Sequence, residues 1–148
     1  KDDDFLDLYC GTGTIGLSMA TKAKSLIGVE IIPDAIEDAK LNAKLNNIDN
    51  AEFICGDAKD AIKELQQRKI TPKVVILDPP RKGCNEELLK TVTEMKPQRI
   101  VYVSCDPATL ARDAERLLKL GYETKKVTPV DMFPRTSHVE TVCLLSRK

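Results

Sequence analysis

Short apolar runs alternate with stretches of helical period along most of this 148-residue chain. Runs rich in Val and Ile predict buried strands at residues 5–9, 25–30, 51–55, 73–78 and 99–105. Between these runs, the spacing of apolar residues predicts helices near residues 14–23, 33–46, 58–68, 85–95 and 107–119. Alternation of this kind constrains the fold to a parallel sheet with helices on both of its faces.

The end of the chain breaks this alternation. Residues 122–134 and 138–148 are two extended stretches with no helical period between them, so we expect an antiparallel pair to close one edge of the sheet. The sequence therefore predicts one α/β domain over residues 1–148, with a seven-stranded, mostly parallel sheet and an antiparallel terminal hairpin. Because the chain opens with charged residues followed at once by a strand, we expect it to be a piece of a longer protein.

Composition and charge argue against several classes of function. The 23 basic and 23 acidic residues give zero net charge, which provides no electrostatic footprint for nucleic acid or for a membrane surface. No signal peptide and no membrane-spanning apolar run is present in the sequence. The five cysteines form no C-x-x-C pair and there is a single histidine, so we expect no metal site. Free thiols fit a reducing compartment, and we expect a cytoplasmic location.

The stretch FLDLYCGTGTIGLSMA raises the main functional question. Gly11, Gly13 and Gly16 satisfy the G-x-G-x-x-G pattern of dinucleotide-binding turns. Glu30, at the end of the next predicted strand, has the place of an acid that binds ribose hydroxyls. NAD and S-adenosylmethionine both need these features, so the pattern does not separate them. Asp7, inside the first strand, and the D-P-P turn after the fourth favour the cationic cofactor S-adenosylmethionine.

Polar or reactive side chains follow all five predicted parallel strands. In an open α/β sheet, ligands bind beyond the carboxyl ends of the strands, which is where the sequence places Tyr9, Thr14, Glu30, Asp57, Asp78, Cys105 and Asp106. Each residue also has an ordinary structural explanation. Asp57 and Asp106 have the position of helix N-caps, and Glu30 that of a solvated charge. The combination, more than any single residue, indicates a binding site.

The cysteines fall into two groups. Cys10, Cys55, Cys84 and Cys143 are expected to be small apolar fillers, because free cysteines are usually buried and inert. Cys105 differs, since it lies where a strand meets the start of a helix, a place where thiols are exposed and reactive. Its position alone still slightly favours an inert role.

Six motifs point to a known family. DLYCGTG, GVE, CGDA, LDPPRKG, VSCDP and FPRTSHVET occur in this order, and together they resemble the RNA (uracil-5-)-methyltransferases. The likeness is greatest to bacterial ribosomal RNA enzymes and their transfer RNA relatives, and it covers essentially the whole chain. It implies a Rossmann-like class I methyltransferase fold that uses S-adenosylmethionine. It also implies methylation of C5 of a uridine in RNA, with 23S ribosomal RNA as the first candidate substrate.

The resemblance also assigns roles to individual residues. It implies that S-adenosylmethionine is bound by Tyr9, Gly11, Gly13, Thr14, Glu30, Asp57 and Asp78. Cys105 would be the nucleophile that adds to C6 of uracil, which makes C5 reactive enough to accept a methyl group. Glu140 would be the general base that then removes the C5 proton. Without the resemblance, Glu140 is best explained as an ordinary strand residue.

Family members carry an upstream part, often with an RNA-binding barrel and sometimes with an iron–sulfur cluster. This chain has neither, so ribosomal or transfer RNA would be bound mainly through that missing part. One alternative is a cofactor-binding domain that is inactive when truncated. Another is a cytosine-5 RNA methyltransferase, although such enzymes commonly carry Cys where this chain has Pro80 and Arg81. An amino-group methyltransferase would carry an aromatic residue in place of Arg81, and an NAD-dependent dehydrogenase is the weakest candidate.

Overall fold

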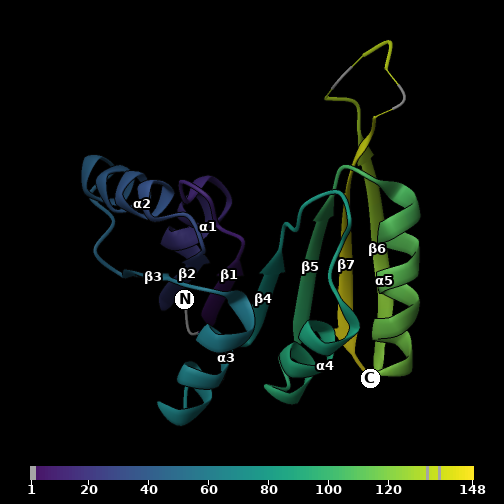
Figure 1. Ribbon diagram of the computed structural model, residues 1–148, viewed down its shortest axis with the longest axis horizontal. Helices are drawn as coiled ribbons and strands as arrows, with labels where there is room; N and C mark the ends of the chain where they lie inside the picture. The colour runs from purple at the N-terminus through teal and green to yellow at the C-terminus, as the bar shows by residue number, and fades with distance from the viewer. Residues whose placement is uncertain (1–2, 133, 137) are drawn as a thin grey trace.

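A mixed sheet with the strand order β3-β2-β1-β4-β5-β7-β6 runs through the computed structural model, which describes residues 3–132, 134–136 and 138–148 (Figure 1). Within these residues the seven strands are β1 (Asp4–Leu8), β2 (Ser25–Glu30), β3 (Ala51–Cys55), β4 (Val74–Leu77), β5 (Arg99–Ser104), β6 (Tyr122–Val130) and β7 (Glu140–Arg147). The first five strands pair in parallel, and β7 lies antiparallel between β5 and β6. The predicted mostly parallel sheet with a terminal antiparallel hairpin is confirmed.

Helices cover both faces of this sheet. One apolar core lies against α1 (Thr14–Met19), the 3-10 turn η1 (Ala20–Lys22) and α2 (Pro33–Leu45). The other lies against α3 (Ala58–Gln67), α4 (Glu86–Glu94) and α5 (Pro107–Lys119). The helix predicted over residues 14–23 is thus α1 followed by η1. No helix in the described ranges is long and apolar enough to cross a membrane.

Side-chain caps fix where several helices begin. The Asp57 carboxylate accepts a hydrogen bond from the Lys59 backbone N–H at 2.9 Å, at the start of α3. Asp106 does the same for Ala108 at 2.9 Å, at the start of α5. These contacts satisfy N–H groups that have no partner inside the helix. Both caps follow the carboxyl ends of strands, so they also fix the loops at that edge of the sheet.

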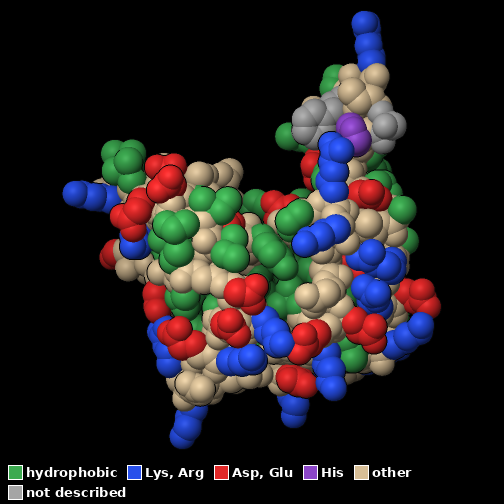
Figure 2. All heavy atoms as spheres, in the orientation of Figure 1, with side chains coloured by type: hydrophobic (Ala, Val, Ile, Leu, Met, Phe, Trp, Pro, Cys, Tyr) green, Lys and Arg blue, Asp and Glu red, His purple; other side chains and the backbone are tan. Residues whose placement is uncertain are grey.

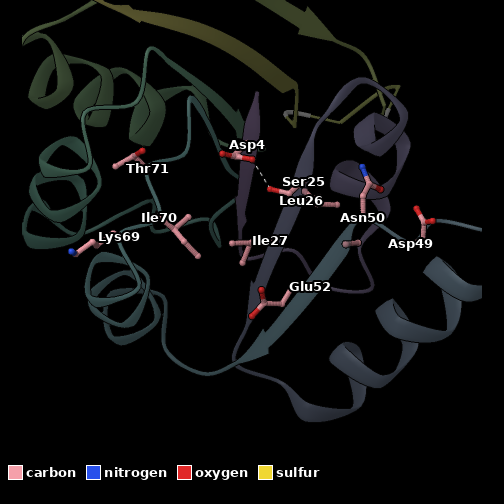
Figure 3. Close-up of a pocket in the computed structure, with 11 residues that line it drawn as sticks. Asp4, Ser25, Leu26, Ile27, Asp49, Asn50, Glu52, Lys69, Ile70 and Thr71 are labelled. Carbon is pink, nitrogen blue, oxygen red and sulfur yellow. Dashed lines mark hydrogen bonds between the residues drawn. The ribbon is translucent and has the colours of Figure 1, made fainter. Parts of the chain in front are cut away.

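The opposite edge, at the amino ends of β1, β2 and β3, holds a hollow of about 410 Å³ (Figure 3). Several of its polar side chains are already paired. Ser25 Oγ donates to Asp4 Oδ1 at 2.8 Å, and Asn50 Nδ2 donates to two backbone carbonyls. Glu52 forms a two-bond ion pair with Arg68 at 2.7 Å. Since these groups already have partners within the protein, we place the candidate site at the other end of the strands, where their carboxyl ends lie.

Candidate active site

The carboxyl ends of the parallel strands meet at one edge of the sheet, and the loop joining β6 to β7 projects beyond that edge (Figure 1). Figure 2 shows the surface hollowed beside this projection, with acidic and basic side chains interspersed over the visible face. Among the described residues, cavities of about 870 Å³ and about 310 Å³ lie here. The polar residues predicted at the strand ends therefore lie at the same end of the sheet as these two cavities.

The larger cavity brings together four of the predicted cofactor residues. It is lined by Tyr9, Glu30, Asp57 and Asp78, among others, which follow four different strands. The remaining three lie in the glycine turn close by but do not line this cavity: Gly11, Gly13 and Thr14, the last of which is exposed. The structure thus groups the acidic strand ends and sets the glycine turn at their border.

The turn after β1 has an unusual backbone. Tyr9, Gly11 and Gly13 all have positive φ angles, of 66°, 53° and 84°. A tyrosine in this left-handed region carries strain of about 1 kcal/mol or more, which the surrounding structure must offset. The backbone is held by Gly13 N–H, which donates to the Cys10 carbonyl at 2.8 Å, and by Cys10 N–H, which donates to Val29 O at 3.0 Å. The turn therefore points the Tyr9 side chain into the larger cavity.

Glu30 connects the second strand to this turn. One of its carboxylate oxygens accepts a hydrogen bond from Gly11 N–H at 3.1 Å. The other accepts from the backbone N–H groups of Ile31 and Ile32, at 2.8 and 3.1 Å. The two isoleucine side chains are 63% and 56% exposed and line the cavity. They offer an apolar surface for a flat ring next to an acidic group.

Asp7 lies beneath the turn and not in the cavity. Its side chain is 1% exposed, and its Oδ2 accepts a hydrogen bond from Gly16 N–H at 2.9 Å. Its Oδ1 has no hydrogen-bond partner among the described residues. Burial raises the pKa of Asp7 to about 7, with a smaller contribution from the charge of Asp78. The sequence argument placed this acid near the cofactor, but the alternation of side chains along β1 directs it toward α1.

Asp78 lies in the larger cavity, close enough to Glu140 for their charges to interact. It follows β4, is half-buried and lines the larger cavity. Burial raises the pKa of Asp78, and the charge of Glu140 raises it further. Because Glu140 lines the smaller cavity, the two carboxylates couple the sites electrostatically.

The smaller cavity contains both predicted catalytic residues. It is lined by Arg81, Cys105, Thr136, His138 and Glu140. In the antiparallel pairing of β5 with β7, Ser104 is opposite Thr141. Cys105 and Glu140 are the next residues on each strand, so the register brings them to the same end of the ladder. Cys105 is partly exposed, as a nucleophile must be.

Sequence reasoning missed several residues that line these cavities. Lys82, Cys84, Asn85, Arg112 and Arg116 line the larger one, and Arg81, Thr136 and His138 line the smaller one. The DPPR and SHVE motifs contained a signal for Arg81 and His138, whose side-chain nitrogens lie 3.5 Å apart. No local signal existed for the two α5 arginines, because only the packing of α5 brings them there. Phe133 and Ser137 of the last motif lie outside the described residues.

The predicted burial of the cysteines is confirmed for Cys10, Cys84 and Cys143 and is wrong for Cys55, which is exposed. Cys55 ends β3, one of the two edge strands of the sheet. An edge strand has a neighbour on one side only, so its last side chain has little to pack against. Among the described residues, no group of three or more His, Cys, Asp or Glu side chains could hold a metal ion.

The strand order and the acidic strand ends define a class I methyltransferase domain. The same fold occurs in a precorrin-6y C5,15-methyltransferase from Geobacter metallireducens, with a TM-score of 0.82 and 16% identity over 99% of this chain and 81% of that one. The family model for tRNA (uracil-5-)-methyltransferases matches residues 1–148, and the chain belongs to this family.

Individual relatives are longer than this chain. An uncharacterized RNA methyltransferase of Clostridium acetobutylicum is 57% identical over 141 residues, which cover 95% of this chain and 31% of the relative. The Pyrococcus abyssi tRNA (uracil-54, C5)-methyltransferase, solved in complex with S-adenosyl-L-homocysteine, has a TM-score of 0.82 and 36% identity. That match covers 98% of this chain and 34% of the Pyrococcus chain. The chain thus spans about a third of the length of the curated relatives it matches.

Proposed function

We propose that the protein, acting in the cytoplasm, methylates C5 of a uridine in RNA with S-adenosylmethionine as the methyl donor. The observation that carries this proposal is the pairing of Cys105 with Glu140 in one small cavity, next to a larger one with acidic walls. A thiol and a carboxylate are the two groups that covalent methylation at C5 requires. Membership of the tRNA (uracil-5-)-methyltransferase family supports the proposal.

The larger cavity suits S-adenosylmethionine because several carboxylates, which are hydrogen-bond acceptors, line it. The carboxylates of Glu30, Asp57 and Asp78 can accept hydrogen bonds from the ribose hydroxyls. Their negative charge would also favour the positively charged sulfonium of the cofactor. Ile31 and Ile32 suit the flat adenine ring. We assign Tyr9, Gly11, Gly13 and Thr14 to the same cofactor site, at the border formed by the glycine turn. When bound, S-adenosylmethionine supplies an electrophilic methyl group on a cationic sulfonium.

Cys105 activates the target base in this proposal. C5 of uracil is a poor nucleophile, and addition of the Cys105 thiolate to C6 shifts the ring electrons to form an enolate. This addition makes C5 electron-rich at the place where the two cavities adjoin. A cavity of about 310 Å³ fits one pyrimidine extruded from its stack, which is how enzymes reach a base inside a helix.

Glu140 completes the cycle. After C5 carries its methyl group, the Glu140 carboxylate removes the remaining C5 proton. The enolate then reforms, expels the thiolate from C6 and restores the aromatic ring. Since Glu140 and Cys105 line the same small cavity, next to the last pair of the β5–β7 ladder, we place Glu140 beside the base that the thiol holds.

The proposed substrate is 23S ribosomal RNA, and transfer RNA is the alternative that the family name and the Pyrococcus enzyme favour. The zero net charge of this chain offers few phosphate contacts. We therefore propose that most of the RNA is held by parts of the protein that correspond to the remaining length of the relatives.

The test is transfer of labelled methyl groups from S-adenosylmethionine to ribosomal and transfer RNA by the whole protein, followed by mapping of the modified base. We expect Cys105→Ala to abolish transfer and the exposed-cysteine control Cys55→Ser to retain it. Label on cytosine would support the cytosine-5 alternative. Full activity of Cys105→Ala would refute the assignment of the nucleophile.

A further inference from the structure

An ion cluster centred on the buried Asp113, in the middle of α5, lies beside the larger cavity, which its two arginines, Arg112 and Arg116, help to line. Asp113 is 0% exposed. Its Oδ2 accepts hydrogen bonds from the Tyr102 hydroxyl at 2.6 Å and from Cys84 N–H at 2.8 Å. Its Oδ1 accepts from Arg112 Nε at 3.0 Å and from Arg116 Nη1 at 3.2 Å. A buried carboxylate is tolerated only when it is paired in this way.

The same cluster forms hydrogen bonds with the backbone of the loop between β4 and α4, residues 78–85. Besides the contact from Cys84 N–H to Asp113, Arg112 Nη2 donates to the Lys82 carbonyl at 2.8 Å. Arg116 Nη1 donates to the Cys84 carbonyl at 3.3 Å. Three hydrogen bonds therefore tie a three-residue segment of this loop to one helix.

Gly83 shows how closely the loop is pressed onto the cluster. Its φ is +72°, and a Cβ at this position would lie 2.5 Å from Asp113 Oδ2 and 2.7 Å from Arg112 Nη2. No side chain larger than hydrogen fits there without displacement of the cluster. Gly83 N–H also donates to the Pro80 carbonyl at 2.8 Å. This hydrogen bond connects residues 82–84, which the cluster holds, to the DPPR turn.

The loop contributes residues to both cavities. Asp78 lines the larger cavity and Arg81 the smaller one. The helix that holds the loop also begins next to Cys105, where Asp106 caps its first turn. One helix thus fixes both the nucleophile and the loop opposite it.

We propose that Asp113 is a positioning residue, which holds the 78–85 loop on α5 so that Asp78 and Arg81 are placed in the cofactor and base cavities. It touches neither cavity itself and acts through Cys84, Arg112 and Arg116. The part that concerns Arg81 and methyl transfer rests on the proposed function. The part that concerns the loop and cofactor binding does not.

The reactivity of the Cys84 thiol reports directly whether the 78–85 loop is held on α5. Its side chain is 1% exposed, and burial raises the pKa of its thiol to about 12. The thiol is therefore protonated and shielded as long as the loop is held. Release of the loop exposes it to alkylation, while Cys10 and Cys143, buried elsewhere in the domain, stay protected as long as the fold is intact.

The experiment uses Asp113→Asn in the whole protein, with Glu115→Gln as the matched control on the exposed side of α5, where Glu115 pairs with Lys119. Alkylation by N-ethylmaleimide is followed residue by residue by mass spectrometry, well below the unfolding temperature. We expect Cys84 in Asp113→Asn to react at least about tenfold faster, with Cys10 and Cys143 unchanged. The exposed Cys55 serves as the internal standard.

Cofactor binding and kinetics complete the test. Asp113→Asn should weaken binding of S-adenosylmethionine measured by calorimetry, and should lower kcat by about 10–100-fold through misplacement of Arg81. If Asp113→Asn does not fold, Arg112→Lys carries the test through Cys84 alkylation alone, because it keeps the charge and loses the contact to the Lys82 carbonyl, while Arg112 itself lines the larger cavity.

A lower Tm with normal Cys84 protection, normal cofactor binding and normal kcat would overturn the proposal and leave Asp113 a purely stabilising role. If the wild type transfers no methyl group to RNA, the proposed function fails. The alkylation and cofactor measurements still decide whether Asp113 holds the loop.

Discussion

We predict that the contribution of Asp7 to the free energy of unfolding decreases as the pH rises. The carboxyl lies in β1, 1% exposed, with a hydrogen bond to one oxygen and no described partner for the other. Burial raises its pKa from 3.8 to about 7, the charge of Asp78 adds to this, and the Gly16 N–H opposes it. The folded state therefore binds the Asp7 proton more tightly than the unfolded state.

The sign and size follow from proton linkage. Because the raised pKa belongs to the folded state, the stabilisation from proton binding is present at low pH and is lost as the pH rises from about 4 through about 7. A pKa difference of about 3, at about 1.4 kcal/mol for each pH unit, corresponds to about 4 kcal/mol in total. Between pH 5 and pH 8 the loss is about 2–3 kcal/mol.

The variant Asp7→Asn removes this titration and keeps an oxygen for the Gly16 N–H. Urea unfolding at pH 5, 6, 7 and 8 gives the free energy of unfolding for each protein. We expect the wild type to lose about 2–3 kcal/mol more than Asp7→Asn across this range. Asp34→Asn, an exposed change in the first turn of α2, should run parallel to the wild type. Parallel pH curves for wild type and Asp7→Asn would refute the argument.

Two further predictions concern the candidate site. Glu30→Ala should weaken binding of S-adenosylmethionine, measured by calorimetry, by about 1–3 kcal/mol, because ribose hydroxyls and the Gly11 N–H lose their acceptor; unchanged affinity would contradict the assignment. Glu140→Gln should still add to the base through Cys105 but release it slowly, so a denaturant-resistant protein–RNA complex should accumulate on gels. RNA carrying 5-fluorouridine should trap the wild type in the same way, because fluorine does not leave as a proton does. A complex linked at Cys84 in place of Cys105 would show that the nucleophile is wrongly assigned.

The sheet could be predicted from the sequence because each strand and helix has its own local period. Parallel strands also bring their carboxyl ends to one edge, which is why Tyr9, Glu30, Asp57 and Asp78 were predicted together and line one cavity. This inference needed the direction of the strands and not their order.

What depends on strand order or helix rotation could not be predicted in the same way. Cys55 is exposed because β3 is the edge strand, a fact that no local pattern contains. Arg112 and Arg116 reach the 78–85 loop only because α5 packs beside α4, and their contacts with the loop span 30 and 32 residues of sequence. Asp7 was correctly seen as unusual, but its direction depends on which face of β1 is covered by α1.

The glycines of the G-x-G-x-x-G match have different roles in the structure. Three residues of the turn are left-handed, namely Tyr9 and the first two glycines of the pattern, Gly11 and Gly13. Gly16 is required for a different reason, since a Cβ there would lie 2.7 Å from Asp7 Oδ2. The third glycine of the pattern therefore reports packing of α1 on β1, and the acid in the first strand is the cause of that glycine. The pairing of Asp7 with Gly16 therefore explains the acid inside the first strand by the packing of α1 on β1, and not by contact with the cofactor.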